Sequence, residues 1–421
     1  MSIGYACIAL GVREGKLKRC ILNKASEDKL RDVIDSNLSA LESIINYNIK
    51  NGVKLFRISS DIIPFASHPI NQIKWWEDYE DKLLRIGERI KKGNIRVSMH
   101  PGQYSVLNSN NSEVVSNAIK DLEYHNRLLD KLNVDKSCKI VLHVGGVYGN
   151  KQEALERFCN HYDCLDEKIK QRLIIENDER CYNIEDVLNI GVKKNIPVVF
   201  DILHHQVNLP KKDLNYVDWI KLSSKTWNGF DGKQKVHYSE QSKTGRIGAH
   251  SSTVSINEFL SFYNKVKDLD IDIMLETKDK NLSCLKCIYS TQESIPRKYI
   301  EKEWARYKYL VMSKSYALYR EVSKLFKDEK NAKDLSLKFY RLIEKAQCTN
   351  YSKSDEENTA LHIWGYFKKF ALEKEKKLFF EKLEKTKSED EDIKLIKKYL
   401  YKLADKYEKE YLLRSHYFLG Y

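Results

Sequence analysis

The chain has 421 residues, a formal net charge of +13 and 42% hydrophobic residues, so it can bury a large core. It is longer than one barrel of roughly 250 residues requires, and it has no apolar run of about 18 residues that would predict a membrane-spanning helix. The basic balance suits a polyanion such as nucleic acid, but a lysine-rich surface typical of an AT-rich genome would give the same balance.

The first residues and the cysteines indicate the compartment. Residues 1–5 lead directly into a strand-like run with no basic segment before it, so we expect no signal peptide. The nine cysteines are irregularly spaced, which indicates reduced thiols and not a disulfide framework. We therefore expect a cytoplasmic protein that is monomeric and has no membrane partner.

Residues 1–290 alternate two patterns. Short apolar runs bounded by breakers predict buried parallel strands at 3–10, 53–58, 95–99, 140–144, 173–176, 198–202, 219–222 and 271–275. Apolar residues at three-to-four spacing predict helices at 27–47, 79–91, 112–132, 151–168, 184–194 and 256–269. This alternation predicts an α/β fold, a (β/α)₈ TIM barrel over residues 1–295. A doubly wound open sheet is the alternative.

Two further segments complete the outline. The segment between Ser223 and Ser255 is long and polar, and we interpret it as a functional loop because it contains two histidines and several glycines. Beyond about residue 295, helical patterns follow one another at 297–312, 316–325, 332–347, 359–370, 373–383 and 390–408. Residues 300–421 are therefore predicted to form a second, all-helical domain. Residues 291–421 carry +8 of the net charge.

Histidines and carboxylates stand at or just after the ends of six successive predicted strands, where barrel enzymes carry their active sites. They are His100, His143, Glu176, Asp201, His204, His237, His250 and Glu276. One such side chain alone is usually an ordinary hydrogen-bonded residue, but eight at one end indicate a shared site. Only a closed barrel brings all of them together, which favours the barrel over the open sheet.

Mixed histidine and carboxylate ligands suit Zn²⁺ or Mn²⁺. Eight ligands are too many for one ion, so we predict a cluster of two or three ions. Glu176 is the predicted bridge between two of them, and His204 and His250 would hold a third. Such a cluster suits phosphodiester hydrolysis, because one ion lowers the pKa of a bound water and a pair about 3.5–4 Å apart stabilises the attacking and leaving oxygens.

The strand-end motifs resemble the UV damage endonuclease family, a relative of endonuclease IV on the same barrel. The matching stretches are Gly4-Tyr5, Phe56-Arg57-Ile58-Ser59-Ser60-Asp61, Ser67-His68-Pro69, Met99-His100-Pro101-Gly102-Gln103-Tyr104, His143-Val144-Gly145-Gly146, Ile175-Glu176-Asn177-Asp178, Phe200-Asp201-Ile202-Leu203-His204-His205, Lys235-Val236-His237-Tyr238-Ser239 and Ala249-His250-Ser251. The resemblance implies metal-dependent cleavage of double-stranded DNA immediately 5′ to a UV photoproduct, with products that have a 3′-hydroxyl and a 5′-phosphate. It implies Mn²⁺ as the metal, with Zn²⁺ or Mg²⁺ as alternatives.

The same resemblance assigns roles to residues. The family's metal ligands fall on the eight strand-end residues. Its probe residues, which enter the duplex at the lesion, fall on Gln103 and Tyr104, on the loop after the third predicted strand. Tyr5 and His68 match positions near the lesion pocket, and Lys235 matches a lysine that can become carboxylated beside the metals. The predicted catalytic residues are Glu176, His237, Lys235 and His68.

The helical tail resembles a second family. Residues 316–320 and 361–369 are similar to the small YbgA-type helical domain, whose function is unknown. We hypothesise that its positive charge adds non-specific DNA affinity. Three alternatives to a UV damage endonuclease stay open at this point: an abasic-site enzyme of the endonuclease IV type, a metal-dependent sugar isomerase on the same barrel, and a non-catalytic binding module.

Overall fold

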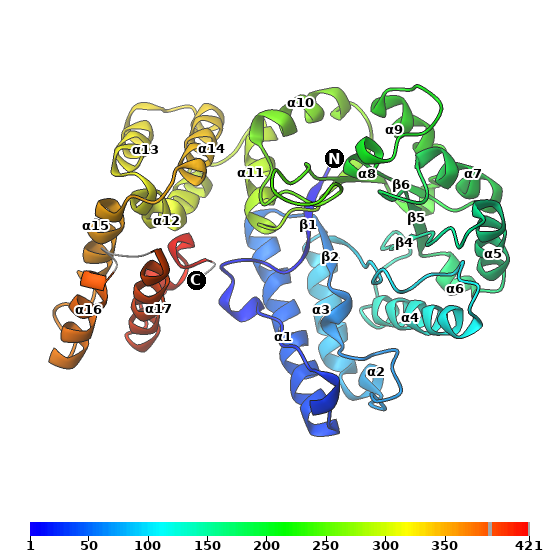
Figure 1. Cartoon of the computed structure of the whole chain (residues 1–421), viewed down its shortest axis with the longest axis horizontal. Coiled ribbons are helices and arrows are strands. Elements are labelled where there is room, and N and C mark those ends of the chain that lie inside the picture. The colour runs from blue at the N-terminus through cyan, green and yellow to red at the C-terminus, as the bar shows by residue number, and fades with distance from the viewer. Residues whose placement is uncertain (386–389, 420–421) are drawn as a thin grey trace. The chain divides into compact units, whose positions relative to one another are not determined.

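The computed structural model describes residues 1–385 and 390–419 (Figure 1). The chain forms two compact units, which we call the barrel unit and the helical unit. The barrel unit comprises Met1–Ala9 and Glu14–Leu285, and the helical unit comprises Leu10–Arg13 and Lys286–Tyr421. Within the described residues, no helix combines the length and the apolar content needed to cross a membrane. All nine cysteines are free thiols, as predicted.

Eight parallel strands form the centre of the barrel unit. They are β1 (Ile3–Cys7), β2 (Leu55–Ile58), β3 (Arg96–Ser98), β4 (Ile140–His143), β5 (Leu173–Glu176), β6 (Val198–Asp201), β7 (Gln234–Tyr238) and β8 (Ile271–Leu275). Their order in the sheet is β3-β2-β1-β8-β7-β6-β5-β4. A parallel bridge between Met99 and Ile140 links the two edge strands. The barrel is therefore nearly closed, so the predicted TIM barrel is confirmed and the open sheet is wrong.

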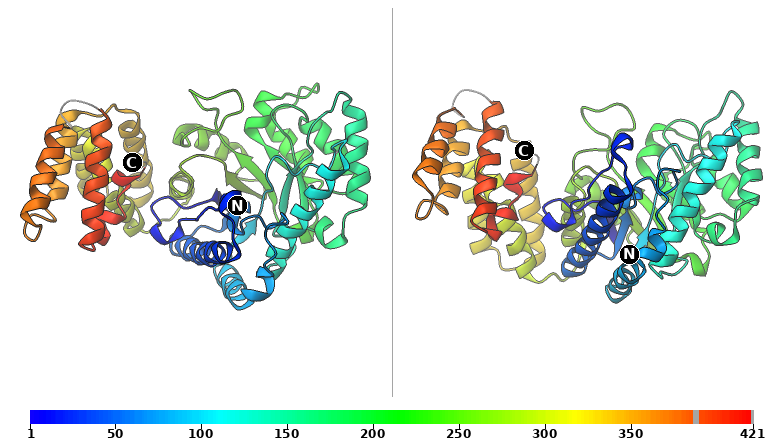
Figure 2. Two further views of the ribbon diagram at one scale, coloured as in Figure 1. Left: turned by 60° about the horizontal axis from the view of Figure 1, so that its bottom comes forward. Right: turned by 90° about the horizontal axis from the view of Figure 1, so that it is seen from below.

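Helices surround these strands (Figures 1 and 2). They are α1 (Glu27–Asn51), α2 (Trp75–Asp78), α3 (Glu80–Lys92), α4 (Ser112–Lys131), α5 (Lys151–Asp163), α6 (Glu167–Lys170), α7 (Ile184–Lys194), α8 (Ile202–Val207), α9 (Tyr216–Ser224), α10 (Ile256–Val266) and α11 (Asn281–Thr291). Local signals set their ends. Ser26 caps α1 by accepting a hydrogen bond from Lys29 N at 3.3 Å, and Gly52 ends it in the left-handed region at a φ of 73°.

The seventh strand is not where the sequence predicted it. Residues 219–222 lie in helix α9, which begins where the Asn215 side chain accepts hydrogen bonds from the next turn and which buries Trp219 on one face. The true seventh strand, β7, lies inside the segment interpreted as a loop. All five of its residues are buried, including Gln234, Lys235 and His237. His237 therefore belongs to a strand and not to a loop.

The helical unit contains α12 (Arg297–Lys314), α13 (Tyr316–Asp328), α14 (Ala332–Cys348), α15 (Lys353–Trp364), α16 (Glu373–Lys385), α17 (Asp390–Lys406) and α18 (Glu410–Leu413). The helix predicted at 359–370 begins earlier, because Ser352 caps it, and ends earlier in a turn. Its core combines aliphatic and aromatic residues, and the rings of Trp364 and Phe379 stack in it with centroids 4.5 Å apart.

Candidate metal centre and DNA-contact loop

The loop after β3 presents Gln103 and Tyr104 to solvent. Both side chains are exposed, and Tyr104 is 72% exposed, so both are accessible to a binding partner. Gly102 comes directly before them. A side chain at this position would meet the exposed ring of Tyr104, which would have to move away.

Hydrogen bonds anchor this loop on its C-terminal side. Ser105 Oγ donates to Asp121 Oδ2 at 2.5 Å, and the other oxygen of Asp121 accepts from Ser67 Oγ at 3.3 Å. Asn108 Nδ2 donates to the carbonyl oxygen of Gly146 at 2.7 Å. Asp121, in α4, thus ties the loop after β3 to the loop after β2. A loop held in this way loses little conformational freedom when it binds.

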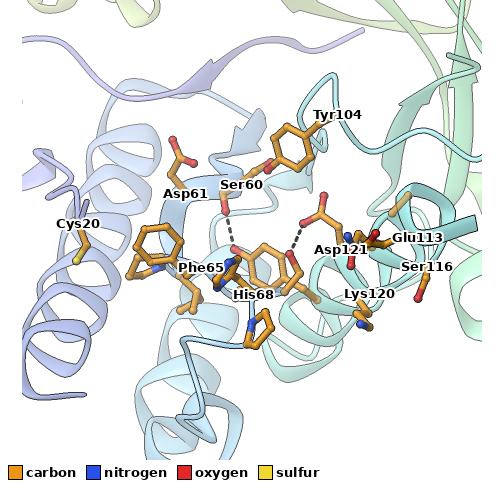
Figure 3. A pocket seen from close by; sticks show the side chains of 18 of the residues that line it. Cys20, Ser60, Asp61, Phe65, His68, Tyr104, Glu113, Ser116, Lys120 and Asp121 are labelled. Atoms are coloured by element: carbon orange, nitrogen blue, oxygen red, sulfur yellow. Dashed lines mark hydrogen bonds between the residues drawn. The ribbon is translucent and has the colours of Figure 1, made fainter. Parts of the chain in front are cut away.

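A groove with a volume of about 1230 Å³ lies beside Tyr104 (Figure 3). Its walls come from residues within 18–20, 60–69 and 112–124. His68 belongs to this wall, is exposed, and accepts a hydrogen bond from Ile70 N at 3.1 Å through Nδ1. The structure therefore places His68 beside Tyr104, whereas Glu176, His237 and Lys235, with which it was grouped as catalytic, lie inside the barrel.

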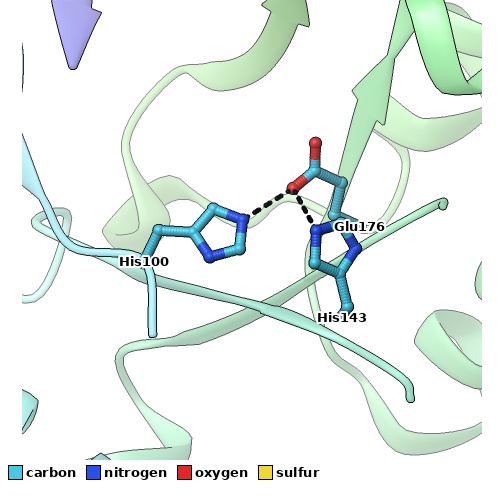
Figure 4. A group of neighbouring side chains, drawn as sticks. All are labelled: His100, His143 and Glu176. Carbon is cyan, nitrogen blue, oxygen red and sulfur yellow. Dashed lines mark hydrogen bonds and ion pairs between the residues drawn. The ribbon is translucent and has the colours of Figure 1, made fainter. Parts of the chain in front are cut away.

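Glu176, the last residue of β5, is the centre of the strand-end group (Figure 4). Its Oε2 lies 3.2 Å from His100 Nε2 and 3.8 Å from His143 Nε2. Its Oε1 lies 2.6 Å from His237 Nδ1 and 4.0 Å from His204 Nδ1. The carboxylate is 1% exposed, so four histidines from four strand ends surround one buried carboxylate.

Glu276, directly after β8, extends the group. Its Oε1 lies 3.2 Å from His237 Nδ1, and its Oε2 lies 3.7 Å from His250 Nε2. Asp201, the last residue of β6, lies 3.6 Å from His204, measured from Oδ1 to Nδ1. All eight residues predicted as ligands are therefore joined in one continuous set of contacts.

Backbone hydrogen bonds orient two of the imidazoles. His100 Nδ1 donates to the carbonyl oxygen of Pro101 at 3.0 Å, and His204 Nδ1 donates to the carbonyl oxygen of Asn177 at 2.9 Å. Once such a ring is neutral with its proton on Nδ1, its Nε2 lone pair can bind a metal, the usual arrangement of a ligating histidine. The Asn177 side chain also bonds both backbone groups of Asp201, at 2.9 and 3.0 Å.

Burial and neighbouring charges set the protonation of the group. Burial lowers the pKa of His143 to about 4, so this imidazole is neutral. Burial also opposes the charge on His204, but Asp201, Glu176 and Glu276 outweigh it and raise the pKa of His204 to about 9. Burial would raise the pKa of Glu176, yet His237 and His100 hold it well below the usual range.

The donor set fits divalent metal ions. Four buried atoms have no hydrogen-bond partner among the described residues: His143 Nδ1, Asp201 Oδ2, His237 Nε2 and His250 Nδ1. Two triplets, each with ligand atoms within 4.8 Å of one another, share Glu176: His100, His143 and Glu176, and Glu176, Asp201 and His237. Buried polar atoms need partners, and imidazole nitrogens with carboxylate oxygens suit Zn²⁺ or Mn²⁺.

Lys235 lies inside the barrel but below this group. It stands two residues before His237 on β7, so both side chains point to the interior. Its Nζ is buried and has no hydrogen-bond partner among the described residues. Burial, together with the charge of Arg96, lowers the pKa of this amine well below its usual value.

Tyr5 does not reach the site. It is fully buried, its hydroxyl donates to Asn48 Oδ1 in α1 at 2.7 Å, and its ring contacts Phe56. The side chain therefore points from β1 toward the surrounding helices and away from the barrel interior. The expected contact of Tyr5 with a lesion stays a prediction.

Two neighbours of the ligands were missed by sequence reasoning. Arg57 on β2 forms a buried ion pair with Glu276, and it helps to hold the pKa of that carboxyl below its usual range, against the effect of burial. Asn177, next to Glu176, orients His204 and Asp201. A signal existed for Arg57, because a charged residue in an otherwise apolar barrel strand needs a buried partner.

A sequence model of the family described as "UV-endonuclease UvdE" matches residues 2–301. The chain belongs to the UV-endonuclease UvdE family. A "UV DNA damage endonuclease" of Clostridium perfringens (strain 13 / Type A) is 43% identical over 351 residues, which cover 82% of this chain and 83% of the relative. Another, of Bacillus cereus (strain Q1), is 36% identical over 265 residues, which cover 62% of this chain and 83% of the relative.

The solved structures agree with this membership. The crystal structure of SacUVDE has 39% sequence identity and a TM-score of 0.65, and the match covers 68% of this chain and 96% of that chain. Residues 308–421 match a family described as "Protein of unknown function (DUF1722)". Both resemblances expected from the sequence are therefore confirmed.

Proposed function

We propose that the chain is a metal-dependent DNA repair endonuclease that hydrolyses the phosphodiester bond immediately 5′ to UV photoproducts, leaving a 3′-hydroxyl and a 5′-phosphate. The observation that carries the proposal is the set of eight contacting ligands around Glu176, which stands on the same strand ends as the exposed Gln103–Tyr104 loop. Membership of the UV-endonuclease UvdE family supports the substrate, and the buried donor set supports the metal dependence.

We propose two or three Mn²⁺ ions at this site. When bound, such ions activate water and stabilise the negative charge of a reacting phosphate. Glu176 would be shared between the side that carries His100 and His143 and the side that carries Asp201 and His237. His204 and His250, with ring centroids 6.2 Å apart, would hold the third ion.

Two neighbouring residues hold the ligands in the charge state and the orientation that metal binding requires. Arg57 keeps Glu276 ionised, and Asn177 fixes the ring of His204 and the backbone of Asp201. Ligands that are already oriented lose little freedom when an ion binds, which raises affinity.

The loop after β3 supplies the contact with damaged DNA. An amide such as Gln103 can hydrogen-bond the unpaired edges of bases opposite a flipped lesion, and the Tyr104 ring can stack on them. Because only the short turn of Pro101 and Gly102 separates these side chains from His100, recognition and cleavage would take place on neighbouring nucleotides. We propose that His68, which lines the same groove as Tyr104, contacts DNA.

Lys235 is the proposed carboxylated lysine. A neutral amine is required, because the amine nitrogen attacks carbon dioxide and releases a proton when the carbamate forms. The lowered pKa of Lys235 favours the neutral amine. The carbamate would add an oxygen donor inside the barrel, directly below His237.

An incision assay tests the proposal. Three duplexes of one sequence carry a cyclobutane dimer, an abasic site or no lesion, and each is incubated with Mn²⁺ or with EDTA. We expect one cut immediately 5′ to the dimer, only with Mn²⁺, and a product that a DNA polymerase extends from its 3′-hydroxyl. Cleavage of the abasic duplex alone would favour the endonuclease IV type, and no cleavage of any duplex would contradict both.

A further inference from the structure

The helical unit displays tyrosine rings on its surface. Tyr366 and Tyr411 are 37% and 40% exposed, and their rings stack with centroids 6.1 Å apart and planes at 18°. Tyr316 is 39% exposed and stacks on Tyr319, with centroids 5.5 Å apart and planes at 24°. Large exposed rings on a helical unit that already has an aromatic core indicate a binding surface.

The buried Tyr309 contacts both members of the Tyr366–Tyr411 pair. The hydroxyls of Tyr309 and Tyr366 are 3.1 Å apart, and the ring of Tyr309 lies 6.3 Å from that of Tyr411. The pKa of Tyr411 is raised by burial and by the nearby hydroxyls of Tyr366 and Tyr319. The hydroxyl of Tyr319, from the second pair, thus lies near enough to act electrostatically on Tyr411 and Tyr309.

Phe370, four residues beyond Tyr366, is a further exposed ring of the helical unit, 44% exposed. Lys409 Nζ lies 4.5 Å from the centre of its ring. We call the set Tyr316, Tyr319, Tyr366, Phe370 and Tyr411 the aromatic face.

Positive charge accompanies the aromatic face. Residues 361–372, which hold Tyr366 and Phe370, contain two lysines and no acidic residue, and residues 304–320, which hold Tyr316 and Tyr319, contain four Lys or Arg and no acidic residue. Lys368, Lys369 and Arg320 are exposed and form no ion pair within the described part of the chain. The acidic residue next to Tyr411, Glu410, is neutralised by Arg414 at 3.1 Å.

We propose that the aromatic face binds single-stranded DNA. Stacked aromatic rings flanked by cations are the means by which proteins hold unpaired bases without reading their sequence. The choice of a single strand follows from the rings, because the faces of bases in an intact duplex are covered by their neighbours. The proposal is independent of the metal centre and of the function proposed for it.

The test uses the full-length chain in EDTA, so that no strand is cut. Fluorescein-labelled oligo-dT of about 20 nucleotides and a hairpin duplex of equal length are titrated at one salt concentration. We expect Tyr366→Ala with Tyr411→Ala to weaken oligo-dT binding about tenfold or more, with a much smaller effect on the duplex. Leu395→Ala, which truncates a side chain on α17 that is 49% exposed, is the matched control and should bind like the unmodified chain.

Two further double variants distinguish the contribution of ring stacking from that of the tyrosine hydroxyls and from the effect of misfolding. Tyr366→Phe with Tyr411→Phe keeps both rings and should retain oligo-dT binding, and Lys368→Glu with Lys369→Glu should weaken it about tenfold without touching the core. The proposal is wrong if the double alanine variant binds oligo-dT normally, or if it loses oligo-dT and duplex equally. It is also wrong if the unmodified chain dimerises through these rings and its DNA binding does not depend on them, since the face would then join two copies.

Discussion

The two ends of the barrel interior both bury charged side chains, but they differ in how those charges are satisfied. At the end where the strands begin, Arg96 donates to the carbonyl oxygens of Ser137, Lys233 and Asp231 at 2.6–2.9 Å and pairs with Asp272 at 3.2 Å. This guanidinium has a partner for each of its three nitrogens. It closes the barrel at this end and needs no ligand.

At the end where the strands finish, the charges around Glu176 are incompletely paired. Four ligand residues keep a buried nitrogen or oxygen without a hydrogen-bond partner among the described residues. An unsatisfied buried polar atom costs about 1–3 kcal/mol, and four such atoms on residues of one contacting group favour a site that binds a further partner. Buried charge alone therefore does not identify the site, whereas its combination with unpartnered atoms in one group of histidines and carboxylates favours it.

Replacing Glu176 should have the largest effect on metal binding and on incision. We expect Glu176→Ala to lose bound Mn²⁺ and to reduce incision 5′ to a dimer on the order of a thousandfold, because both metal triplets share this carboxylate. Metal content per molecule and the rate of incision are the measurements. The fold should survive, since the substitution leaves the buried apolar residues of β5 and their packing in place. Retained metal and activity would show that the centre lies elsewhere.

Removing the probe residues should affect DNA and not the metal. Gln103→Ala with Tyr104→Ala should lower kcat/KM on the dimer duplex about tenfold to a hundredfold, by loss of stacking and of amide hydrogen bonds. Bound Mn²⁺ should be unchanged, because neither side chain belongs to the two triplets that could hold an ion. Leu209→Ala, at a position 66% exposed in the barrel unit, is the control. If the double variant also lost bound Mn²⁺, the loop would be needed for metal binding as well as for contact with DNA.

Protons should compete with Mn²⁺ for His204, so the affinity for Mn²⁺ should depend on pH. The pKa of His204 is about 9 without metal, so this imidazole is protonated at neutral pH and must release its proton to become a ligand. The apparent Mn²⁺ affinity should rise about tenfold per pH unit below pH 9 and level off above it. Free Mn²⁺, measured by electron paramagnetic resonance between pH 6.5 and 8.5, gives the slope. His204→Gln should flatten this slope, and an equally steep slope in that variant would assign the proton to another residue.

Asp121 should have a smaller effect through the two loops that it joins. Asp121→Asn weakens the hydrogen bond from Ser105 and should lower kcat/KM on the dimer duplex about threefold to tenfold, with metal affinity unchanged. Asp121 is a positioning residue, so the change should appear in KM more than in kcat. Ser105→Ala should reproduce the effect if the loop after β3 is responsible, whereas Ser67→Ala should reproduce it if the loop after β2 is.

Seven of the eight strands were predictable because their residues are apolar, as strands covered on both faces usually are. β7 was not, because its buried residues include Gln234, Lys235 and His237, a composition that resembles a loop. The segment predicted in its place, 219–222, is apolar because helix α9 buries Trp219 and Ile220. Apolar content locates buried segments but does not distinguish a short strand from one face of a helix.

The strand-end ligands could be predicted because strand ends of a barrel meet at one rim, whatever the details of packing. Tyr5 could not be placed in this way. On a strand buried on both faces, the sequence does not show which residues point inward, and Tyr5 points outward to Asn48. The anchoring of Ser105 by Asp121 was equally hidden, because it depends on the packing of α4 against two loops.

Disrupting the other end of the barrel should leave the metal centre nearly unaffected. Arg96→Gln should lower the free energy of unfolding by roughly 3 kcal/mol, because it leaves Asp272 buried without its cation. Urea denaturation measures this loss, while Mn²⁺ affinity and incision by the folded fraction should stay the same. Lys235 lies between the two ends and responds electrostatically to Arg96. A change in Mn²⁺ affinity in Arg96→Gln would therefore mean that Arg96 influences the metal centre through Lys235. The charged groups at the two ends of the barrel interior would then be electrostatically coupled.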